Sequence, residues 1–419
     1  MKSIKSWENR LKSILAAMII MVGSILVPAQ PAQAAVWDIS INSFIKQLGQ
    51  AVNLPANSST QNPYLEAAVN AGIVKPDDFA NLNSKITRTD VAVLLNRADE
   101  YLHGDTVDPK LLNFVLEKRI SDINKVPEGK RTEVAKIFAK GIIKGFSNGY
   151  YIQNRQFRGN SYITASTAKS LIKLVVNPDK RAKISPDGML IRTTNLPKNA
   201  DKYEYILACY PNKFYERKFE FMWTDGWKTS SYKNYCVFPV EMRKETFKNW
   251  YDQWPLSTEM DKHLYEWADM AEKYLQYIFN VDYRTVNDEW VEGLGSLYVK
   301  GNRNEADDIR TYYIGKMKEN KVKVESSIIA VEPSTFYQDD CYCMRAYVRY
   351  RITAKDISVK QSKLIYSQYP ALDNLRSGEW REGIFDIRFG TNNGSSGNGS
   401  DFAIDIMTHF IDAYNVPIQ

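Results

Sequence analysis

The strongest constraint on the fold is a pattern of features that occurs twice in the first half of the chain. In residues 119–175 an amphipathic helix is followed by the glycine-bounded run GIIKG, a polar loop, and a second helix that starts near Thr164. Residues 62–102 have the same order: a helix, the run Gly72-Ile73-Val74, a loop, and the run ITRTD (residues 86–90) at the start of another helix. This part of the chain is therefore predicted to consist of short helices separated by polar loops.

The second helix of each unit has a recognisable start. Thr87 is a good N-cap residue, and Asp90 places a carboxylate in the first turn, where the helix dipole favours negative charge. Residues 39–55 (ISINSFIKQLGQAVNLP) have the character of such a second helix, although the rest of a third unit is not obvious. We therefore expect three equivalent helices, near residues 40–53, 87–102 and 164–176.

The two units resemble S-layer homology (SLH) repeats. The SLH pattern is roughly F-x-D, a helix, G-I-I-x-G, a polar loop, and I-T-R-A-E at the start of a second helix. The resemblance covers residues 39–177 and depends on GIIKG and ITRTD occurring together. SLH domains work as three repeats, so the resemblance implies a mostly α-helical pseudo-trimer, here a permuted one. The chain also resembles SLH-containing surface proteins of Paenibacillus-type bacteria.

The resemblance also implies a ligand. SLH domains bind pyruvylated secondary cell-wall polysaccharide, and the arginine of I-T-R-A-E belongs to the pocket, because its planar fork can pair both oxygens of a ketal carboxylate. Only Arg88 keeps this arginine, since the other two helices begin with SINS and TAST, so we expect at most one intact pocket. The alternative is that Arg88 is a solvated first-turn residue. The predicted glycan-binding residues are Arg88, Asp122 at the F-x-D position, Lys144 and Gly145.

The first 34 residues predict export. Four basic residues precede the apolar run from Ser13 to Val27, and Ala32-Gln33-Ala34 fits the A-x-A rule for signal peptidase. The apolar run is shorter than the roughly 20 residues needed to cross a bilayer. We therefore expect cleavage near Ala34 and no membrane segment afterwards. The leader carries a net charge of +3 out of +6, which leaves the mature chain too weakly basic to predict nucleic-acid binding.

A change in composition divides the mature chain. The turn-rich stretch VVNPDKRAKISPDG separates the helical first part from a second part rich in tryptophan and tyrosine. We predict a signal peptide at residues 1–34, an SLH-like domain at residues 35–183, and a domain of unassigned function at residues 184–419.

In the second domain, predicted helices precede predicted strands. Leu264, Trp267 and Leu275 belong to an apolar stripe at i, i+3, i+4 spacing, which indicates an amphipathic helix. This order predicts an α+β domain with helices packed on one face of a curved antiparallel sheet, for which a cystatin-like cone is one candidate. The predicted helices cover residues 241–279 and 304–318, and the predicted strands cover 322–331, 341–352, 383–389 and 402–410.

The four cysteines leave their pairing open. Cys209 with Cys236 is the easier disulfide, and buried thiols are about as plausible. Cys341 and Cys343 share one side of a predicted strand with Arg345, while the opposite side is more apolar and should face the helices. We expect at least one of these two cysteines to be buried against the helix that carries Trp267. A loop that covers both, or a bridge to Cys209 or Cys236, would explain their burial, with Arg345, Arg349 and Arg351 reaching solvent.

No catalytic or metal-binding motif is present in the sequence. The three histidines are dispersed, and the acidic pairs Asp307/Asp308 and Asp339/Asp340 are more typical of solvated residues than of glycosidase carboxylates. We expect no enzyme activity, no metal and no cofactor. The tryptophans of the second domain either form platforms for sugars or fill the core, and the core is favoured, above all for Trp267.

These observations predict a secreted protein that is associated with the cell wall and has a structural or binding role. The expected partner is secondary cell-wall polysaccharide or a peptidoglycan-linked glycan, with self-assembly as a further option and without nucleic acid. One alternative is a secreted carbohydrate-active enzyme or its glycan-binding accessory module. Another is an SLH-like domain that has lost glycan binding and serves only as a fold.

Overall fold

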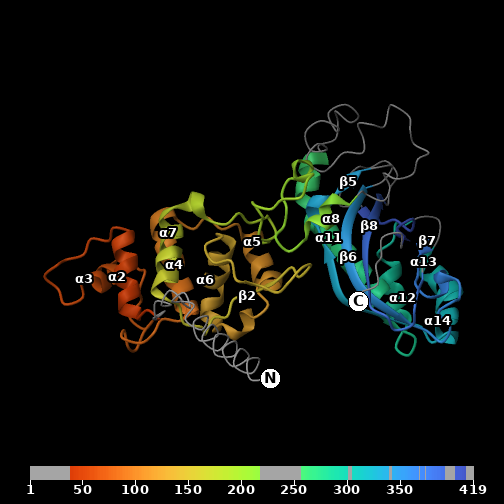
Figure 1. Cartoon of the computed structure of the whole chain (residues 1–419), viewed down its shortest axis with the longest axis horizontal. Coiled ribbons are helices and arrows are strands. Elements are labelled where there is room, and N and C mark those ends of the chain that lie inside the picture. Colours follow the sequence, from red (N-terminus) through yellow and green to blue (C-terminus); the bar gives the residue numbers. More distant parts are fainter. Residues whose placement is uncertain are drawn as a thin grey trace, which may run out of the picture.

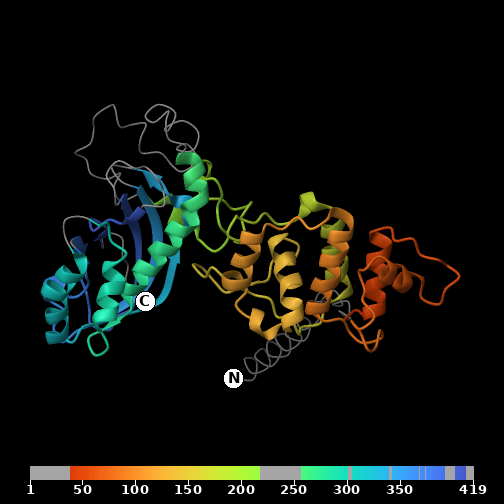
Figure 2. The same ribbon diagram turned by 180° about the vertical axis from the view of Figure 1, so that it is seen from behind.

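The computed structural model describes residues 38–217, 256–300, 304–338, 342–367, 369–372, 374–391 and 402–411. Within them a helical part and a mixed α/β part lie side by side and are joined by the segment that follows residue 176 (Figures 1 and 2). No helix in these ranges is long and apolar enough to cross a membrane. Predicted features outside the described residues are the leader (1–34), Trp223, Trp227, Cys236, residues 241–255, Trp250, Trp254, Asp339, Asp340 and Cys341.

The three equivalent helices predicted for the first part are present. Each begins at a hydroxyl N-cap whose side chain accepts a hydrogen bond from the amide three residues later: Ser40, Thr87 and Thr164. The apolar face of each helix then enters one shared core. The helices are α2 (Ile41–Ala51), α4 (Arg88–His103) and α7 (Ala165–Val176).

The starts of these helices are joined to one another by backbone hydrogen bonds. The amide of Ile39 donates to the carbonyl of Ile163 at 3.0 Å, and the amide of Ile86 donates to the carbonyl of Ile39 at 3.0 Å. Helix α7 packs against both α2 and α4, while α3 (Pro63–Asn70) packs on α2 and α6 (Glu128–Ala139) packs on α4. This is the predicted SLH-like arrangement. The bridged residue pairs are Asp38–Thr164, Ser40–Lys85 and Thr87–Tyr162.

Steric constraints explain the two glycines of GIIKG. Gly141 follows α6 with φ +68°, a left-handed conformation that favours glycine, and a Cβ there would lie 2.0 Å from the carbonyl oxygen of Ala182. Gly145 has φ +69°, and a Cβ there would lie 2.7 Å from the ring of Phe138. Both glycines therefore let the chain turn sharply while backbone or an aromatic ring packs against it.

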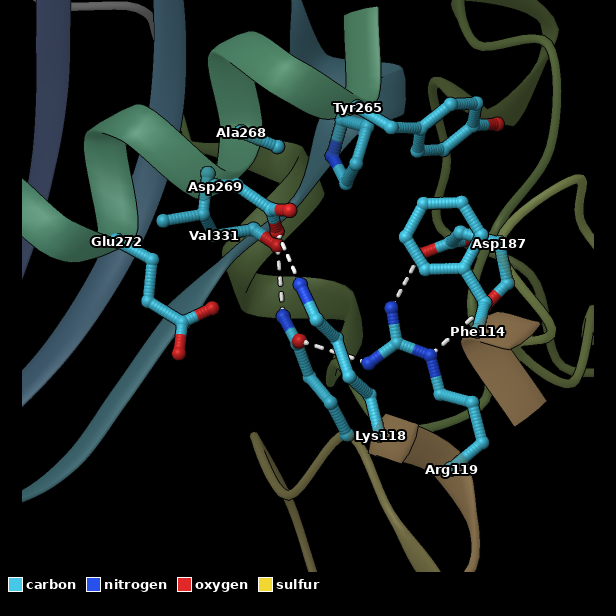
Figure 3. A pocket seen from close by; sticks show the side chains of 11 residues that line it. Phe114, Lys118, Arg119, Asp187, Tyr265, Ala268, Asp269, Glu272 and Val331 are labelled. Carbon is cyan, nitrogen blue, oxygen red and sulfur yellow. Dashed lines mark hydrogen bonds and ion pairs between the residues drawn. The ribbon is translucent and has the colours of Figure 1, made fainter. Parts of the chain in front are cut away.

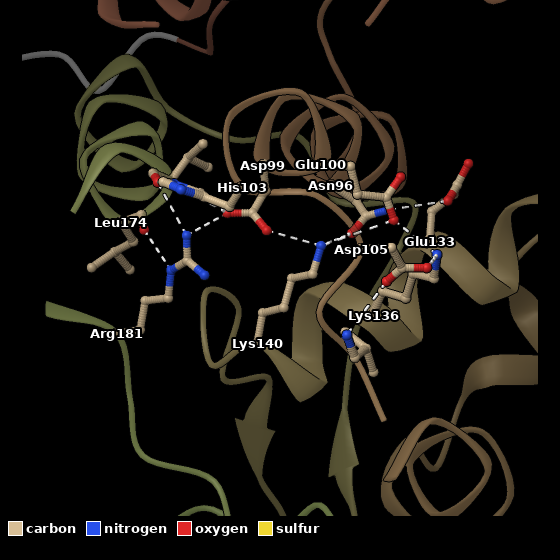
Figure 4. Close-up of polar contacts among 12 residues, drawn as sticks. Asn96, Asp99, Glu100, His103, Asp105, Glu133, Lys136, Lys140, Leu174 and Arg181 are labelled. Carbon is tan, nitrogen blue, oxygen red and sulfur yellow. Dashed lines mark hydrogen bonds and ion pairs between the residues drawn. The ribbon is translucent and has the colours of Figure 1, made fainter. Parts of the chain in front are cut away.

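A buried ion-pair network connects α4 to α6 and to the segment that follows α7 (Figure 4). The Asp99 side chain is fully buried, and its carboxylate contacts Lys140 Nζ at 2.9 Å and the Arg181 guanidinium. Lys140 also donates to Asn96 Oδ1 at 2.8 Å. Because each charge is matched inside the core, the network holds α4 in one position relative to its neighbours.

The second part contains the predicted curved antiparallel sheet. The sheet bends at a bulge between Ser326 and Ile328. Helix α11 (Leu256–Phe279) packs on one face, where Trp267 is buried and stacks on Phe336 and Phe402, as predicted for a core residue. The strand order is β3 (Val281–Asp282), β4 (Lys323–Val331), β6 (Tyr342–Thr353), β8 (Arg381–Thr391) and β9 (Phe402–Ile404), with β5 (Tyr337–Gln338) paired to β6.

Shorter elements complete this part. The predicted strand at 402–410 is two strands, because a turn at Asp405 separates β9 from β10 (His409–Ile411), which pairs in parallel with β7 (Tyr369–Ala371). The predicted helix at 304–318 is one helical run with a π-helical centre. The run consists of α13 (Glu305–Asp308), η8 (Ile309–Ile314) and α14 (Gly315–Glu319), and the separate helix α12 (Asp288–Gly295) precedes it.

The prediction for the cysteine-bearing strand needs correction. Cys343 on β6 is buried, but it packs with residues of the segment 189–217 on the face opposite α11, and not against the Trp267 helix. Arg345 was expected to reach solvent, but it is 1 % exposed and pairs with Asp386 at 2.9 Å. The predicted alternative of a covering loop is confirmed for Cys343, because the segment 189–217 covers this face, and the same cover buries Arg345. Cys209, within that segment, carries a free thiol.

We expect Gly141→Ala to destabilise the helical part by at least about 2 kcal/mol, because it adds a left-handed alanine and a clash with backbone. Urea unfolding measures the effect. Gly129→Ala is the matched control: it lies in α6, and a Cβ there meets nothing within 4 Å. Equal stability of the two variants would contradict the steric role of Gly141.

We expect Asp99→Ala to lower the free energy of unfolding by about 3–5 kcal/mol, because it removes the carboxylate that pairs with Arg181 and leaves buried Lys140 with only Glu100, at 3.9 Å. Asp105→Ala is the control, since the Asp105 side chain is 52 % exposed and pairs with Lys136 at the surface. Denaturant unfolding of both variants tests this, and a loss below 1 kcal/mol for Asp99→Ala would refute the role of the network.

Glu332, which follows β4, should make the stability of the folded protein depend on pH. It is fully buried, and burial raises the pKa of its carboxyl to about 8. An unfolded chain releases this proton near pH 4.5, so the stability contributed by neutral Glu332 is lost as pH rises from about 4.5 to about 8. The free energy of unfolding of Glu332→Gln, measured relative to wild type, should therefore be higher at pH 8.5 than at pH 5 by at least about 2 kcal/mol. Thermal unfolding at both pH values measures this.

The control for Glu332 is Glu325→Gln. Hydrogen bonds from Lys323 and Arg351 lower the pKa of Glu325. Its contribution to stability is therefore lost only at acidic pH and should stay constant between pH 5 and pH 8.5. A stability difference between Glu332→Gln and wild type that does not change with pH would contradict the prediction.

Candidate functional site

Arg88, the predicted pocket arginine, is the first residue of α4. Its guanidinium lies over the rings of Phe146 and Phe157, at 5.0 and 5.5 Å from their centroids. Within the described ranges its side chain takes part in no ion pair, and its Nε is buried without a hydrogen-bond partner. Burial lowers the pKa of Arg88, nearby Arg158 lowers it further, and Asp122 opposes both. An unsatisfied cation of this kind favours the binding of an anion.

Arg158 supplies a second guanidinium at the same place. It lies 4.2 Å from the centroid of the Phe146 ring and donates from Nε to Gln156 at 3.1 Å. Arg158 has φ +59°, a conformation that costs free energy in a residue other than glycine and that is often kept at functional sites. The sequence reasoning missed Arg158. The sequence feature that could have indicated it is the position of this cation in the polar loop just before the helix that starts at Thr164.

Asp122 holds this loop in place. One carboxylate oxygen accepts a hydrogen bond from the amide of Phe157 at 2.6 Å, and the other accepts one from the amide of Arg158 at 2.8 Å. Both oxygens are therefore engaged with backbone, which explains how Arg158 keeps its left-handed conformation. The F-x-D position thus acts on the site through the loop.

Lys144 and Gly145 immediately precede Phe146. The Lys144 side chain is exposed, and its carbonyl accepts a hydrogen bond from Arg155 Nη1 at 2.9 Å. Gly145 lets the chain pass over Phe138 and places Phe146, which is 39 % exposed, next to both arginines. The structure therefore brings Arg88, Asp122 and the run from Lys144 to Phe146 to one site, and it adds Arg158.

The starts of the other two helices differ. Lys85 lies beside the starts of α2 and α7, where it pairs with Asp38 at 2.8 Å and lies over the exposed ring of Tyr162. Its charge is therefore matched, unlike that of Arg88. An open groove of about 650 Å³ runs between α2 and α7 and is lined by Gln47, Gln50, Ala51, Ala165, Ser166, Lys169, Ile172 and Lys173.

The residues considered for catalysis are engaged elsewhere. The Asp307 side chain is 65 % exposed and pairs with Arg310, and His263 Nδ1 lies 2.6 Å from Glu266. His103 contacts the carbonyl of Val175 through Nε2 at 3.0 Å. Among the residues that the structure describes, no group of three or more His, Cys, Asp or Glu side chains is arranged to hold a metal ion.

Comparison with known proteins agrees with this geometry. The family model described as the S-layer homology domain matches residues 119–164, from the start of the second unit to the N-cap of α7. The matched residues include Asp122, Gly145 and Arg158, while Arg88 comes from the preceding unit. No curated protein matches the chain. The match shows an S-layer homology domain within the chain, which indicates a surface-associated protein anchored to the cell wall.

Proposed function

We propose that this protein is exported and is held to the cell wall non-covalently by an anionic wall polysaccharide that binds between Arg88 and Arg158. The observation that carries the proposal is that two guanidiniums lie against one exposed ring, Phe146, and that neither forms an ion pair within the part of the chain that the structure describes. Export is supported by the leader in residues 1–34.

A pyruvylated glycan matches the chemistry of this site. Its ketal carboxylate has two oxygens that a planar guanidinium can pair with a defined geometry. The exposed part of the Phe146 ring offers an apolar surface for the C–H groups of a sugar, and the negative quadrupole of the ring attracts the two guanidiniums near it. Binding would replace the missing counter-charge of Arg88, which is a gain in free energy that a neutral glycan cannot supply.

Sedimentation of the full mature chain with purified native cell walls tests the proposal. Arg88→Ala and Arg158→Ala should each weaken binding by about tenfold or more, as expected for loss of a charge-assisted hydrogen bond. Arg88→Lys should be intermediate, because it keeps the charge and loses the fork. Arg284→Ala is the charge-matched control, since Arg284 is exposed and pairs with Asp282 in the other part of the chain.

A second comparison uses walls from which the ketal has been removed by mild acid. Wild type should lose most of its affinity for these walls and should behave like the arginine variants. Equal binding to treated and untreated walls would rule out the pyruvyl group as ligand. Arg88→Ala and Arg158→Ala variants that bind native walls as well as Arg284→Ala does would rule out the site.

A cleft between the helical part and helix α11 of the second part favours one alternative, a glycan-binding accessory role. The cleft measures about 390 Å³ and lies between α11 and the run α5 (Pro109–Phe114) and η1 (Val115–Arg119). The rings of Phe114 and Tyr265 contact each other there edge to face, with centroids 5.8 Å apart, and could offer aromatic surface to a sugar. Asp269 beside them pairs with Lys118 at 2.6 Å, which suits binding better than catalysis. Hydrolysis of a wall or plant polysaccharide by the purified protein would favour an enzyme instead.

A further inference from the structure

A hairpin connects the candidate glycan site to the α/β part. Strands β1 (Phe146–Ser147) and β2 (Arg155–Gln156) pair antiparallel, with Phe146 opposite Gln156. Phe146 lies at the base of the hairpin, and Arg158 follows it two residues after β2. The tip, residues 148–154, extends from the helical part toward the sheet, as both views show (Figures 1 and 2).

The tip is held by an aromatic stack on the sheet. The ring of Tyr151 lies parallel to the ring of Tyr347 on β6, with centroids 3.5 Å apart and planes inclined by 2°. The amide of Tyr151 donates to the carbonyl of Cys209 at 2.6 Å. Tyr151 has φ +61°, so its backbone conformation is costly and is maintained by these contacts.

Gln153 adds a hydrogen-bonded contact at the same tip. Its Nε2 donates to the carbonyl of Val331 at the end of β4 at 2.7 Å, and to the hydroxyl of Tyr210 at 3.0 Å. Its Oε1 accepts from Arg119, whose buried side chain also pairs with Asp187 at 2.7 Å (Figure 3). The tip is therefore bonded to the sheet and to the connecting segment at once.

Arg155 connects the base of the hairpin to the connecting segment. Its guanidinium is buried under the ring of Phe138 and donates to two carbonyls, those of Lys144 at 2.9 Å and Gly188 at 3.0 Å. Lys144 lies two residues before Phe146. The backbone that positions Phe146 therefore depends on the segment that begins the second part.

We propose that the α/β part is a working component of the wall-binding site, because its contacts with the hairpin hold Phe146 and Arg158 close to Arg88. Tyr151, Gln153 and Tyr347 are positioning residues, which act on the ligand through the hairpin without touching it. This inference rests on the proposed function, and it implies that the helical part alone binds walls more weakly than the whole chain does.

The experiment compares two substitutions of Tyr347 in the full mature chain. Tyr347→Leu removes the ring that stacks on Tyr151, while Tyr347→Phe keeps it. We expect Tyr347→Leu to weaken sedimentation with purified native walls by about fivefold or more, and Tyr347→Phe to bind like wild type. Phe385→Leu is the control for loss of core packing, because Phe385 lies on the sheet face covered by α11, away from the hairpin.

Amide hydrogen exchange gives a readout that does not need the ligand. The amides of Phe157 and Arg158 donate to Asp122, so their exchange reports whether the base of the hairpin is in place. We expect faster exchange at both amides in Tyr347→Leu, with no change in Tyr347→Phe or Phe385→Leu. Circular dichroism and thermal unfolding establish that each variant is folded before it is compared.

The outcomes separate this inference from the proposed function. Wild-type affinity and unchanged exchange in Tyr347→Leu would overturn the role of the α/β part. If Arg88→Ala loses binding in the same experiments, the proposed function at the glycan site still holds. If wild type does not bind walls, the proposed function fails. Exchange alone then decides whether the sheet positions the hairpin, and unchanged protection of Phe157 and Arg158 refutes it.

Discussion

The backbone hydrogen bonds between the starts of α2, α4 and α7 are the interactions on which the rest of the helical part depends. The extended residues just before the N-caps, Ile39, Ile86 and Ile163, form backbone hydrogen bonds with one another. Each N-cap hydroxyl in turn accepts a hydrogen bond from a free amide in the first turn of its own helix. As a result three helix starts lie at one end of the domain, and their apolar faces meet in a single core. Arg88, the first residue of α4, is thereby placed at that end.

The candidate site depends on the Arg88 guanidinium, which forms no ion pair among the described residues. Two other buried cations, Lys140 and Arg345, pair with Asp99 and Asp386. Arg88 and Arg158 instead both lie against the ring of Phe146. Asp122 is close enough to stabilise Arg88, yet both of its oxygens accept backbone amides, so the guanidiniums keep their capacity for an external anion.

The same hairpin serves the site and the contact between the two parts. Its base belongs to the SLH repeat, and its tip ends in the stack of Tyr151 on Tyr347. A residue with a left-handed backbone conformation lies at each end of the hairpin, Tyr151 at the tip and Arg158 just beyond the base. Each is held by contacts that come from elsewhere in the chain, which links the geometry of the candidate site to the packing of the sheet.

Sequence alone determined the features that local patterns encode. The three helices, their hydroxyl caps, the glycine-bounded turn and the apolar faces of α11 and β6 follow from periodicities of 3.6 and 2 residues and from steric needs at single positions. The tertiary structure alone decided what covers the second face of the sheet, and therefore why Cys343 and Arg345 are buried. It also decided that Arg158 and Arg88 both lie against the ring of Phe146. These contacts join residues far apart in the chain, and local spacing carries no information about them.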